Sequence, residues 1–192
     1  MARKYNRRKK NSSSVISPLL CLGFFSYIYL STENSNPEVL LIGWGALIGI
    51  ILLIFGTAKM SDEKQKLGYI KSPLSQIDQM TGVEFERYLK ANFQEHFGFK
   101  CYLTPKTNDY GADLILEKNG EKIAVQAKRY KGNVGIAAVQ EVIAACSYYG
   151  CDKGIVVTNS FFTKQAINLA KESVIEVELW NRERLKKEFE IE

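Results

Sequence analysis

The residues most able to do chemistry are an aspartate and a glutamine that a tight turn sets side by side on two neighbouring segments. Residues 112–118 (ADLILEK) and 121–130 (EKIAVQAKRY) both have the pattern of β-strands, and Asn119-Gly120 separates them. Asn-Gly favours a type I′ turn, because that turn needs a positive φ at both central residues. A two-residue turn fixes the pairing of the strands and places Asp113 directly opposite Gln126.

Lys128 joins this pair through the alternation of side chains along a strand. Successive side chains point to opposite faces of a sheet, so Asp113, Gln126 and Lys128 are expected to point the same way. Lys128 is also the diagonal neighbour of Asp113, within reach of a long side chain. A carboxylate, an amide oxygen and an ammonium group at one strand pair are what a divalent metal ion and a phosphate require. A longer turn would shift the register and separate the three groups.

The elements around this hairpin predict an α/β domain. The segment Thr81-Gly-Val-Glu84 is typical of a helix capping box, and apolar residues then recur every fourth position until Gly98. Strands are expected at 99–103, 112–118, 121–130, 154–158 and 174–180, and further helices at 136–149, at 163–172 and after Asn181. The order α-β-β-β-α-β-α-β-α predicts a mixed sheet with helices on both faces.

The first eighty residues have a different composition. Two uncharged runs, residues 15–30 and 39–58, are separated by a short polar segment. The second run is long enough to cross a bilayer as a helix, whereas the first is shorter and has the alternative of a buried globular helix. Together they predict a transmembrane hairpin of two helices. A basic N-terminus at 1–14 precedes it, and a linker at 59–80 with a helical turn follows.

The distribution of charge predicts an orientation for this hairpin. Residues 1–80 hold ten Lys or Arg and five Asp or Glu, whereas residues 81–192 hold sixteen of each kind. Positive residues flank the hairpin on both sides, which predicts that the N-terminus and the C-terminal domain are cytoplasmic. Because the domain at 81–192 is neutral overall, attraction for phosphate would come from a local patch at Lys128, Arg129 and Lys131.

The cysteine and histidine content argues against two common kinds of site. The four cysteines, at 21, 101, 146 and 151, form no Cys-x-x-Cys pair, and His96 is the only histidine. A zinc site built from these residues is therefore not expected. Catalysis by a Ser-His or Cys-His pair is not expected either, unless His96 is the base.

Four short motifs occur together in the domain at 81–192. They are Phe85-Glu86, Asp109-Tyr-Gly-Ala-Asp113, Gln126-Ala-Lys128 and Gly154-Ile-Val-Val-Thr158. This combination resembles the Mrr-type restriction endonuclease domain of the PD-(D/E)xK nuclease superfamily. The resemblance covers about residues 80–190 and implies a restriction-endonuclease-like mixed sheet flanked by helices, behind the membrane hairpin.

The resemblance implies a metal-dependent endonuclease that hydrolyses DNA phosphodiester bonds. Asp113, Gln126 and Glu86 would ligate a divalent cation, with Mg²⁺ as the expected ion. Lys128 would complete the catalytic set by orienting the attacking water or stabilising charge on the scissile phosphate. Gln126 holds the place of the second acid of the superfamily pattern and offers an oxygen without a charge. Cutting of both strands would suggest a homodimer.

Several alternatives stay open at this point. Glu86 suits a surface pair with Lys90 equally well. Gln140, on the expected helix at 136–149, either contacts the site or the DNA, or faces solvent. The domain could also be a catalytically inactive, membrane-tethered module. The missing carboxylate at position 126 favours one that binds DNA, and the neutral charge of residues 81–192 favours one that binds protein.

Overall fold

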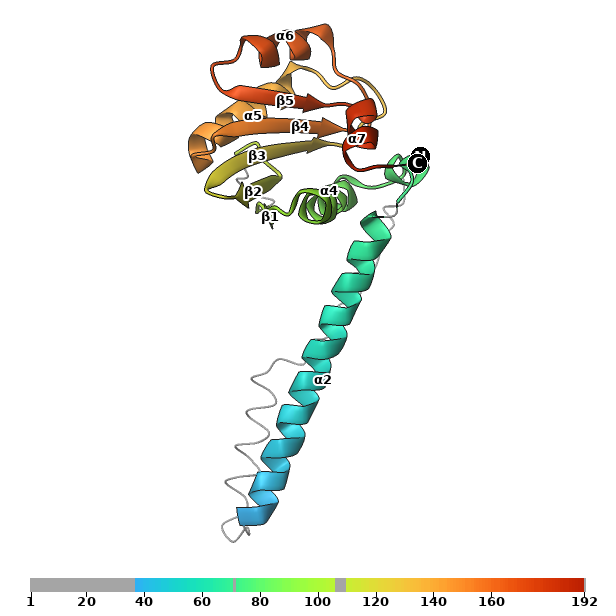
Figure 1. Cartoon of the computed structure of the whole chain (residues 1–192), viewed down its shortest axis with the longest axis vertical. Helices are drawn as coiled ribbons and strands as arrows, with labels where there is room; N and C mark the ends of the chain where they lie inside the picture. The colour runs from blue at the N-terminus through green and yellow to red at the C-terminus, as the bar shows by residue number, and fades with distance from the viewer. Residues whose placement is uncertain (1–36, 71, 106–109, 192) are drawn as a thin grey trace, which may run out of the picture. The chain divides into compact units, whose positions relative to one another are not determined.

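The computed structural model describes residues 37–70, 72–105 and 110–191, and the chain divides into two compact units, Met1–Gly56 and Thr57–Glu192 (Figure 1). The helix α2 (Pro37–Ile70) begins in the first unit and ends in the second. The second unit contains all the strands of the described chain and every predicted site residue that the structure describes.

Within the described residues, α2 is the only helix whose length and composition suit a membrane crossing, over Gly43–Ile70. The second predicted apolar run, 39–58, falls within this helix, and the first run, 15–30, lies outside the described residues. A two-helix hairpin therefore stays a prediction. Residues 59–70, expected to belong to a linker, instead continue α2 without a break.

The remaining elements follow the predicted order α-β-β-β-α-β-α-β-α, after one short additional helix. They are α3 (Leu74–Ile77), α4 (Gly82–Phe97), β1 (Lys100–Leu103), β2 (Leu114–Lys118), β3 (Glu121–Lys128), α5 (Ile136–Tyr149), β4 (Lys153–Thr158), α6 (Lys164–Glu172), β5 (Glu176–Trp180) and α7 (Arg182–Glu188). The predicted capping box of α4 is confirmed, since Thr81 and Glu84 exchange side-chain and backbone hydrogen bonds. Gly98 ends the helix in the left-handed conformation that glycine tolerates.

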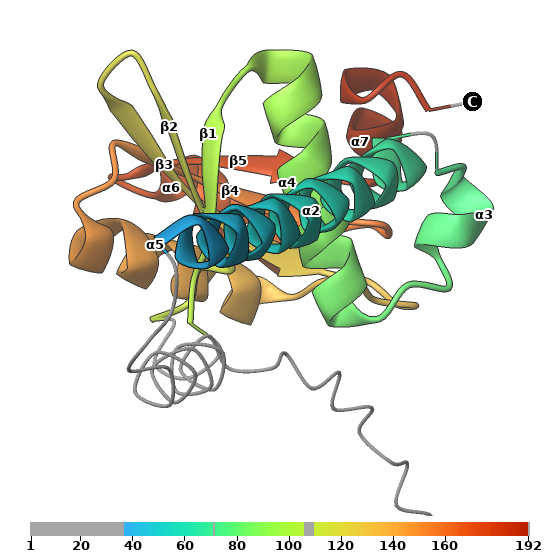
Figure 2. The same cartoon turned by 90° about the horizontal axis from the view of Figure 1, so that it is seen from below.

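The five strands form one mixed sheet in the order β1-β2-β3-β4-β5. The first three strands are antiparallel, and β3, β4 and β5 are parallel. The tight reversal between β2 and β3 is visible in Figure 2. Helices α5 and α6 make the two crossovers between parallel strands, as parallel pairing requires. The prediction of a mixed sheet flanked by helices is confirmed.

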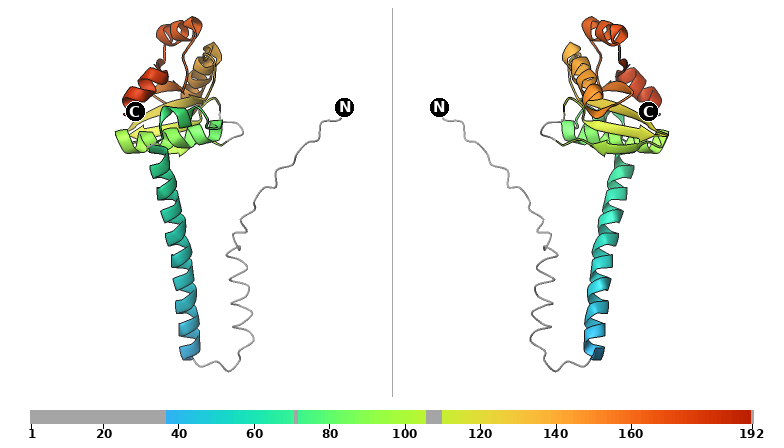
Figure 3. Two further views of the ribbon diagram at one scale, coloured as in Figure 1. Left: turned by 90° about the vertical axis from the view of Figure 1, so that its right-hand side faces the viewer. Right: turned by 90° about the vertical axis from the view of Figure 1, so that its left-hand side faces the viewer.

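The two faces of the sheet carry different cores. Figure 3 shows the ribbon of the sheet and its helices from two further sides. The face under α4 and α7, here called the aromatic face, buries Phe85, Tyr88, Phe93, Trp180 and Phe189. The face under α5 and α6, here called the small-residue face, buries Ala112, Ala124, Ala138, Ala145, Ala166 and Ala170. Strand alternation sends Leu114 and Val125 to the aromatic face and Ala124 to the other.

Candidate active site

The register of the β2–β3 hairpin agrees with the prediction from the sequence. Asn119 and Gly120 have φ of 53° and 87°, the positive values that a type I′ turn needs. The flanking residues Lys118 and Glu121 pair, and the ladder continues to Leu114 opposite Val125. The ladder ends at this pair, and Asp113, just before β2, donates its backbone N–H to the carbonyl oxygen of Val125 at 2.8 Å.

The carboxylate of Asp113 is fixed by two hydrogen bonds from β3. Its Oδ2 accepts from Gln126 Nε2 at 2.8 Å and from the backbone N–H of Ala127 at 2.7 Å. Gln126 is 6% exposed, so its amide is held in a largely dry setting. Because an ionised carboxylate only accepts, the amide nitrogen must face it, and Gln126 Oε1 is the atom left for an ion. The structure thus joins two of the predicted site residues.

Lys128 is held by a partner that the sequence analysis did not single out. Its Nζ lies 2.6 Å from Oε2 of Glu141 in α5, and the lysine side chain is 25% exposed. Gln140, the residue considered on this helix, is exposed to solvent. The spacing contained a usable signal, because Glu141 lies three residues after Ala138 and four before Ala145, beside the buried stripe of the helix, with its own side chain 42% exposed. A charged residue beside such a stripe is well placed to pair with a charge on the sheet.

Gly111 sets how closely the loop before β2 approaches α5. It has a φ of 91°, and a Cβ atom placed there would lie 2.4 Å from the backbone carbonyl oxygen of Glu141. No other residue type fits such a contact without movement of the backbone. The position therefore brings the loop two residues before Asp113 against the turn of α5 that bears Glu141. Asp109, at the start of the same motif, lies outside the described residues.

Glu86 comes from a different layer of the domain. It lies in α4, between side chains that pack onto the aromatic face, and it is half-buried. Gln126 and Lys128 belong to the opposite face by alternation along β3, and Asp113 is hydrogen-bonded to Gln126. Glu86 would therefore have to reach the site around the sheet rather than stand over it, and its role stays a prediction.

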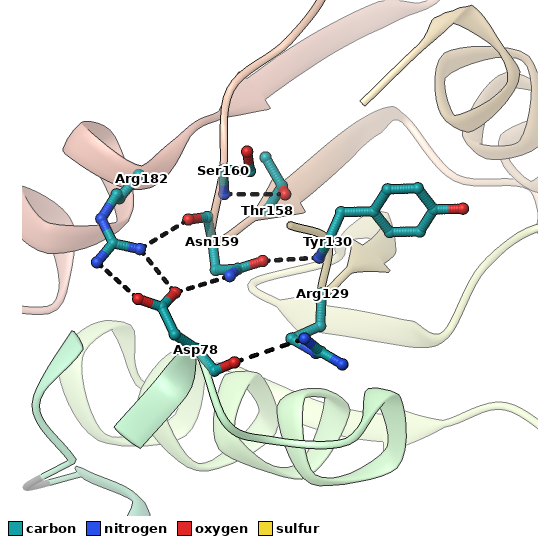
Figure 4. A network of polar contacts seen from close by, with 7 residues as sticks. All are labelled: Asp78, Arg129, Tyr130, Thr158, Asn159, Ser160 and Arg182. Atoms are coloured by element: carbon teal, nitrogen blue, oxygen red, sulfur yellow. Dashed lines mark hydrogen bonds and ion pairs between the residues drawn. The ribbon is translucent and has the colours of Figure 1, made fainter. Parts of the chain in front are cut away.

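A second polar cluster holds the chain immediately after Lys128 (Figure 4). Asp78 binds Arg182 through two hydrogen bonds of 2.7 and 2.9 Å and accepts another from Asn159 Nδ2 at 2.8 Å. Asn159 Oδ1 in turn accepts from the backbone N–H of Tyr130 at 2.8 Å. We call Asp78, Asn159 and Arg182 the clamp. The hydrogen bond from Arg182 lowers the pKa of Asp78 below its ordinary value, so the clamp stays ionised at neutral pH.

The clamp fixes the end of β3 and presents a local basic patch. Asn159 follows β4, whose last residue Thr158 pairs with Lys128 in the parallel register. Beyond the clamp, Tyr130 is 55% exposed and Lys131 is also exposed, while Arg129 is half-buried. An exposed aromatic ring beside cationic side chains suits contact with the backbone and bases of a nucleic acid.

The described cysteines do not suit nucleophilic chemistry. Cys101 and Cys146 are buried free thiols, and burial raises their pKa to about 12 and about 11 respectively. Such thiols stay protonated at neutral pH, and the thiolate is the reactive form. The polar groups around Asp113 are therefore the better candidates for catalysis.

Comparison with known proteins agrees with this arrangement at the level of the domain. A family model described as a restriction endonuclease, Mrr_cat, matches residues 77–189. No curated protein matches the chain.

Among solved structures, the restriction endonuclease AspBHI, described as dependent on DNA modification, is 20% identical, with a TM-score of 0.49 over 64% of this chain and 34% of that one. A protein of unknown function, AF1548, is 18% identical, with a TM-score of 0.41 over 48% of this chain and 54% of that one. The chain thus spans about half or less of the length of these proteins. The family match covers more than half of the sequence, and the chain belongs to the Mrr_cat restriction endonuclease family.

Proposed function

We propose that the domain is a metal-dependent endonuclease that hydrolyses DNA phosphodiester bonds at Asp113, Gln126 and Lys128. The observation that carries this proposal is the 2.8 Å hydrogen bond from Gln126 to Asp113, because Gln126 lies on the strand that also bears Lys128. Membership of a family of restriction endonucleases supports DNA as the substrate. Cleavage of both strands would be done by two copies of the chain.

The donor set fits a hard divalent cation that keeps much of its water. Asp113 offers a carboxylate and Gln126 a carbonyl oxygen, and oxygen ligands of this kind suit Mg²⁺. Among the described residues no group of three His, Cys, Asp or Glu side chains is arranged to hold a metal ion. The remaining ligands would therefore be waters and a phosphate oxygen of the substrate, with Glu86 as a further candidate. Such an ion supplies a water made more acidic and a positive charge next to the scissile phosphate.

The protein residues have separable tasks in this proposal. Asp113 is oriented by the donors from Gln126 and Ala127, so its carboxylate does not have to reorganise when a cation binds. Lys128 would move its ammonium group from Glu141 to the scissile phosphate and stabilise the charge that builds up there. Arg129 and Lys131 would bind the neighbouring phosphates, which makes affinity strongly dependent on salt.

Tethering to a membrane is the second part of the proposal. It is supported by the apolar segment of α2 and by the basic residues that flank the two apolar runs of the sequence. In the proposed topology both runs span the bilayer, and the N-terminus and the nuclease domain face the cytoplasm. Fractionation of cells that left the full-length chain in the soluble fraction would contradict this part alone.

The alternative is a domain with the nuclease fold that binds DNA or protein without cutting. It is favoured by the neutral Gln126, which gives the site one charge fewer than two carboxylates would. Incubating the full-length protein with supercoiled plasmid and Mg²⁺ separates the two possibilities. We expect nicking that stops with a chelator and with Asp113→Asn. DNA binding without nicking in any divalent ion would favour the inactive domain, and the absence of salt-sensitive DNA binding would favour a protein partner.

A further inference from the structure

The candidate site has one carboxylate beside Gln126, that of Asp113. Two carboxylates would bind a doubly charged cation better than one. Asp113 contributes a full charge and Gln126 none, because the amide side chain is neutral at every pH at which the protein is folded. We infer that Glu141 supplies the second carboxylate, which reaches the site from α5 instead of from β3. This inference rests on the proposed function, since it concerns the cation of the same site.

The position of Glu141 follows from two independent contacts. Its Oε2 lies 2.6 Å from Nζ of Lys128, a member of the proposed catalytic set. Its backbone carbonyl lies so close to Gly111 that no side chain fits between them. The loop leading to Asp113, the end of β3 and the middle of α5 thus converge, and Glu141 is at the point where they meet.

The ion pair gives Glu141 a charge partner while no cation is bound. The Glu141 side chain is 42% exposed, and the ammonium group of Lys128 is its counter-charge. The lysine stem is flexible, so its ammonium can leave the carboxylate when a substrate phosphate offers a second anion. Glu141 is then available to the cation, directly or through one of the waters in its shell. Lys128 and the cation therefore compete for the same carboxylate in the absence of DNA.

This competition distinguishes a Glu141 that binds the cation from a Glu141 that only positions Lys128. If Glu141 only orients Lys128, removal of the Glu141 carboxylate affects the cation solely through the lysine. Replacing Lys128 by methionine would then abolish any effect of Glu141 on the binding of a cation. If Glu141 acts on the cation itself, its effect persists in the Lys128→Met background.

The test is a titration of the full-length chain in detergent micelles with Mn²⁺, without DNA, in which electron paramagnetic resonance counts the free ion. We expect Glu141→Gln to weaken Mn²⁺ binding about tenfold or more, in the range seen when groups that support a metal site are removed. We expect at least as large a loss in the Lys128→Met background, where no ammonium competes for Glu141, and tighter binding for Lys128→Met alone for the same reason. Gln126→Glu should restore binding to Glu141→Gln, since it returns a second carboxylate to the site.

The matched control is Glu117→Gln, which removes the carboxylate of another carboxylate–lysine pair on this hairpin, with Lys122 at 3.7 Å. It should leave Mn²⁺ binding unchanged, and near-UV circular dichroism should confirm that each variant keeps its fold. Binding by Glu141→Gln within twofold of the wild type, or an effect that vanishes with Lys128→Met, overturns the inference and leaves the proposed function intact. A wild type that binds no Mn²⁺, or Asp113→Asn that binds it normally, overturns both.

Discussion

The two faces of the sheet differ in what their side chains do. The aromatic face packs large rings against one another, with Phe93 in contact with Phe97, Phe99, Trp180 and Phe189 at centroid distances of 5.2–6.4 Å. The small-residue face buries mostly alanine and valine beneath α5 and α6. Aromatic side chains bury far more surface than alanine, so the first face contributes more of the stability.

The small side chains of the second face allow a close approach instead. With alanine at the contact, α5 lies near enough to the sheet for Lys128 to reach Glu141 and for Gly111 to touch the helix backbone. The polar residues of the candidate site all lie on this side, apart from Glu86. One face thus contributes more of the stability of the domain, while the other buries less surface and brings charged groups from separate elements together.

The largest expected effect comes from removing a ring on the aromatic face. Phe93 is 1% exposed, and Phe93→Ala should lower the free energy of unfolding by about 3–5 kcal/mol through lost burial and a cavity. Val139→Ala on the small-residue face, at a residue that is 0% exposed, should cost about 2 kcal/mol. Urea denaturation followed by tryptophan fluorescence measures both. Equal losses would contradict the division of roles between the faces.

An effect of intermediate size is expected where the loop touches α5. In Gly111→Ala the backbone keeps a φ of 91°, and the new Cβ lies only 2.4 Å from a carbonyl oxygen. We therefore expect the free energy of unfolding to fall by about 3 kcal/mol. Gly120→Ala is the matched control, since its φ is 87° and no atom lies within 4 Å of the new Cβ. It should lose about 1 kcal/mol from backbone strain alone. Similar losses for the two variants would show that the close contact with α5 contributes nothing.

The smallest effect concerns the clamp, which ties elements of the aromatic face to the strand that bears Lys128. The pKa of Asp78 lies below its ordinary value of 3.8 in the folded protein, first because of its hydrogen bond from Arg182. A lowered pKa contributes stability that is present above the unfolded value and is lost as pH falls through the folded one. Asp78→Asn should therefore cost about 1 kcal/mol at pH 7.

The pH dependence of the free energy of unfolding distinguishes loss of the Asp78 charge from a general loss of stability in the variant. The difference in unfolding free energy between wild type and Asp78→Asn should shrink as pH falls below about 4, where the wild-type carboxyl also becomes neutral. Denaturation series at pH 7, 5 and 3 measure this difference. A difference that stays constant across the three series would contradict the role given to the ionised clamp.

Local patterns in the sequence were enough to predict the hairpin and the order of elements. Asn119-Gly120 determines the register by itself, because its turn type allows only one pairing of the flanking strands. The capping box at Thr81 and the apolar repeat after it likewise depend on neighbours within a few residues. These features involve short separations along the chain, where propensity and periodicity are informative.

The parts that escaped prediction involve contacts between distant segments. Asp78 and Arg182 are 104 positions apart, and neither residue has a local pattern that indicates the other. Glu141 carried a signal as a charge beside the buried stripe of α5, but its pairing with Lys128 depends on how α5 packs against β3. The continuation of α2 through residues 59–70 was missed because this polar segment has no apolar stripe of its own.

The proposed site requires that Lys128 acts on a scissile phosphate, and a comparison of two lysines on the same strand tests this role. Lys122 and Lys128 point to the same face of β3, and each lies beside one carboxylate, at 3.7 and 2.6 Å. We predict that Lys128→Met slows Mg²⁺-dependent plasmid cleavage by the full-length protein about 10²–10³-fold, while Lys122→Met leaves the rate within about twofold. Equal rates for the two variants would contradict the proposed site.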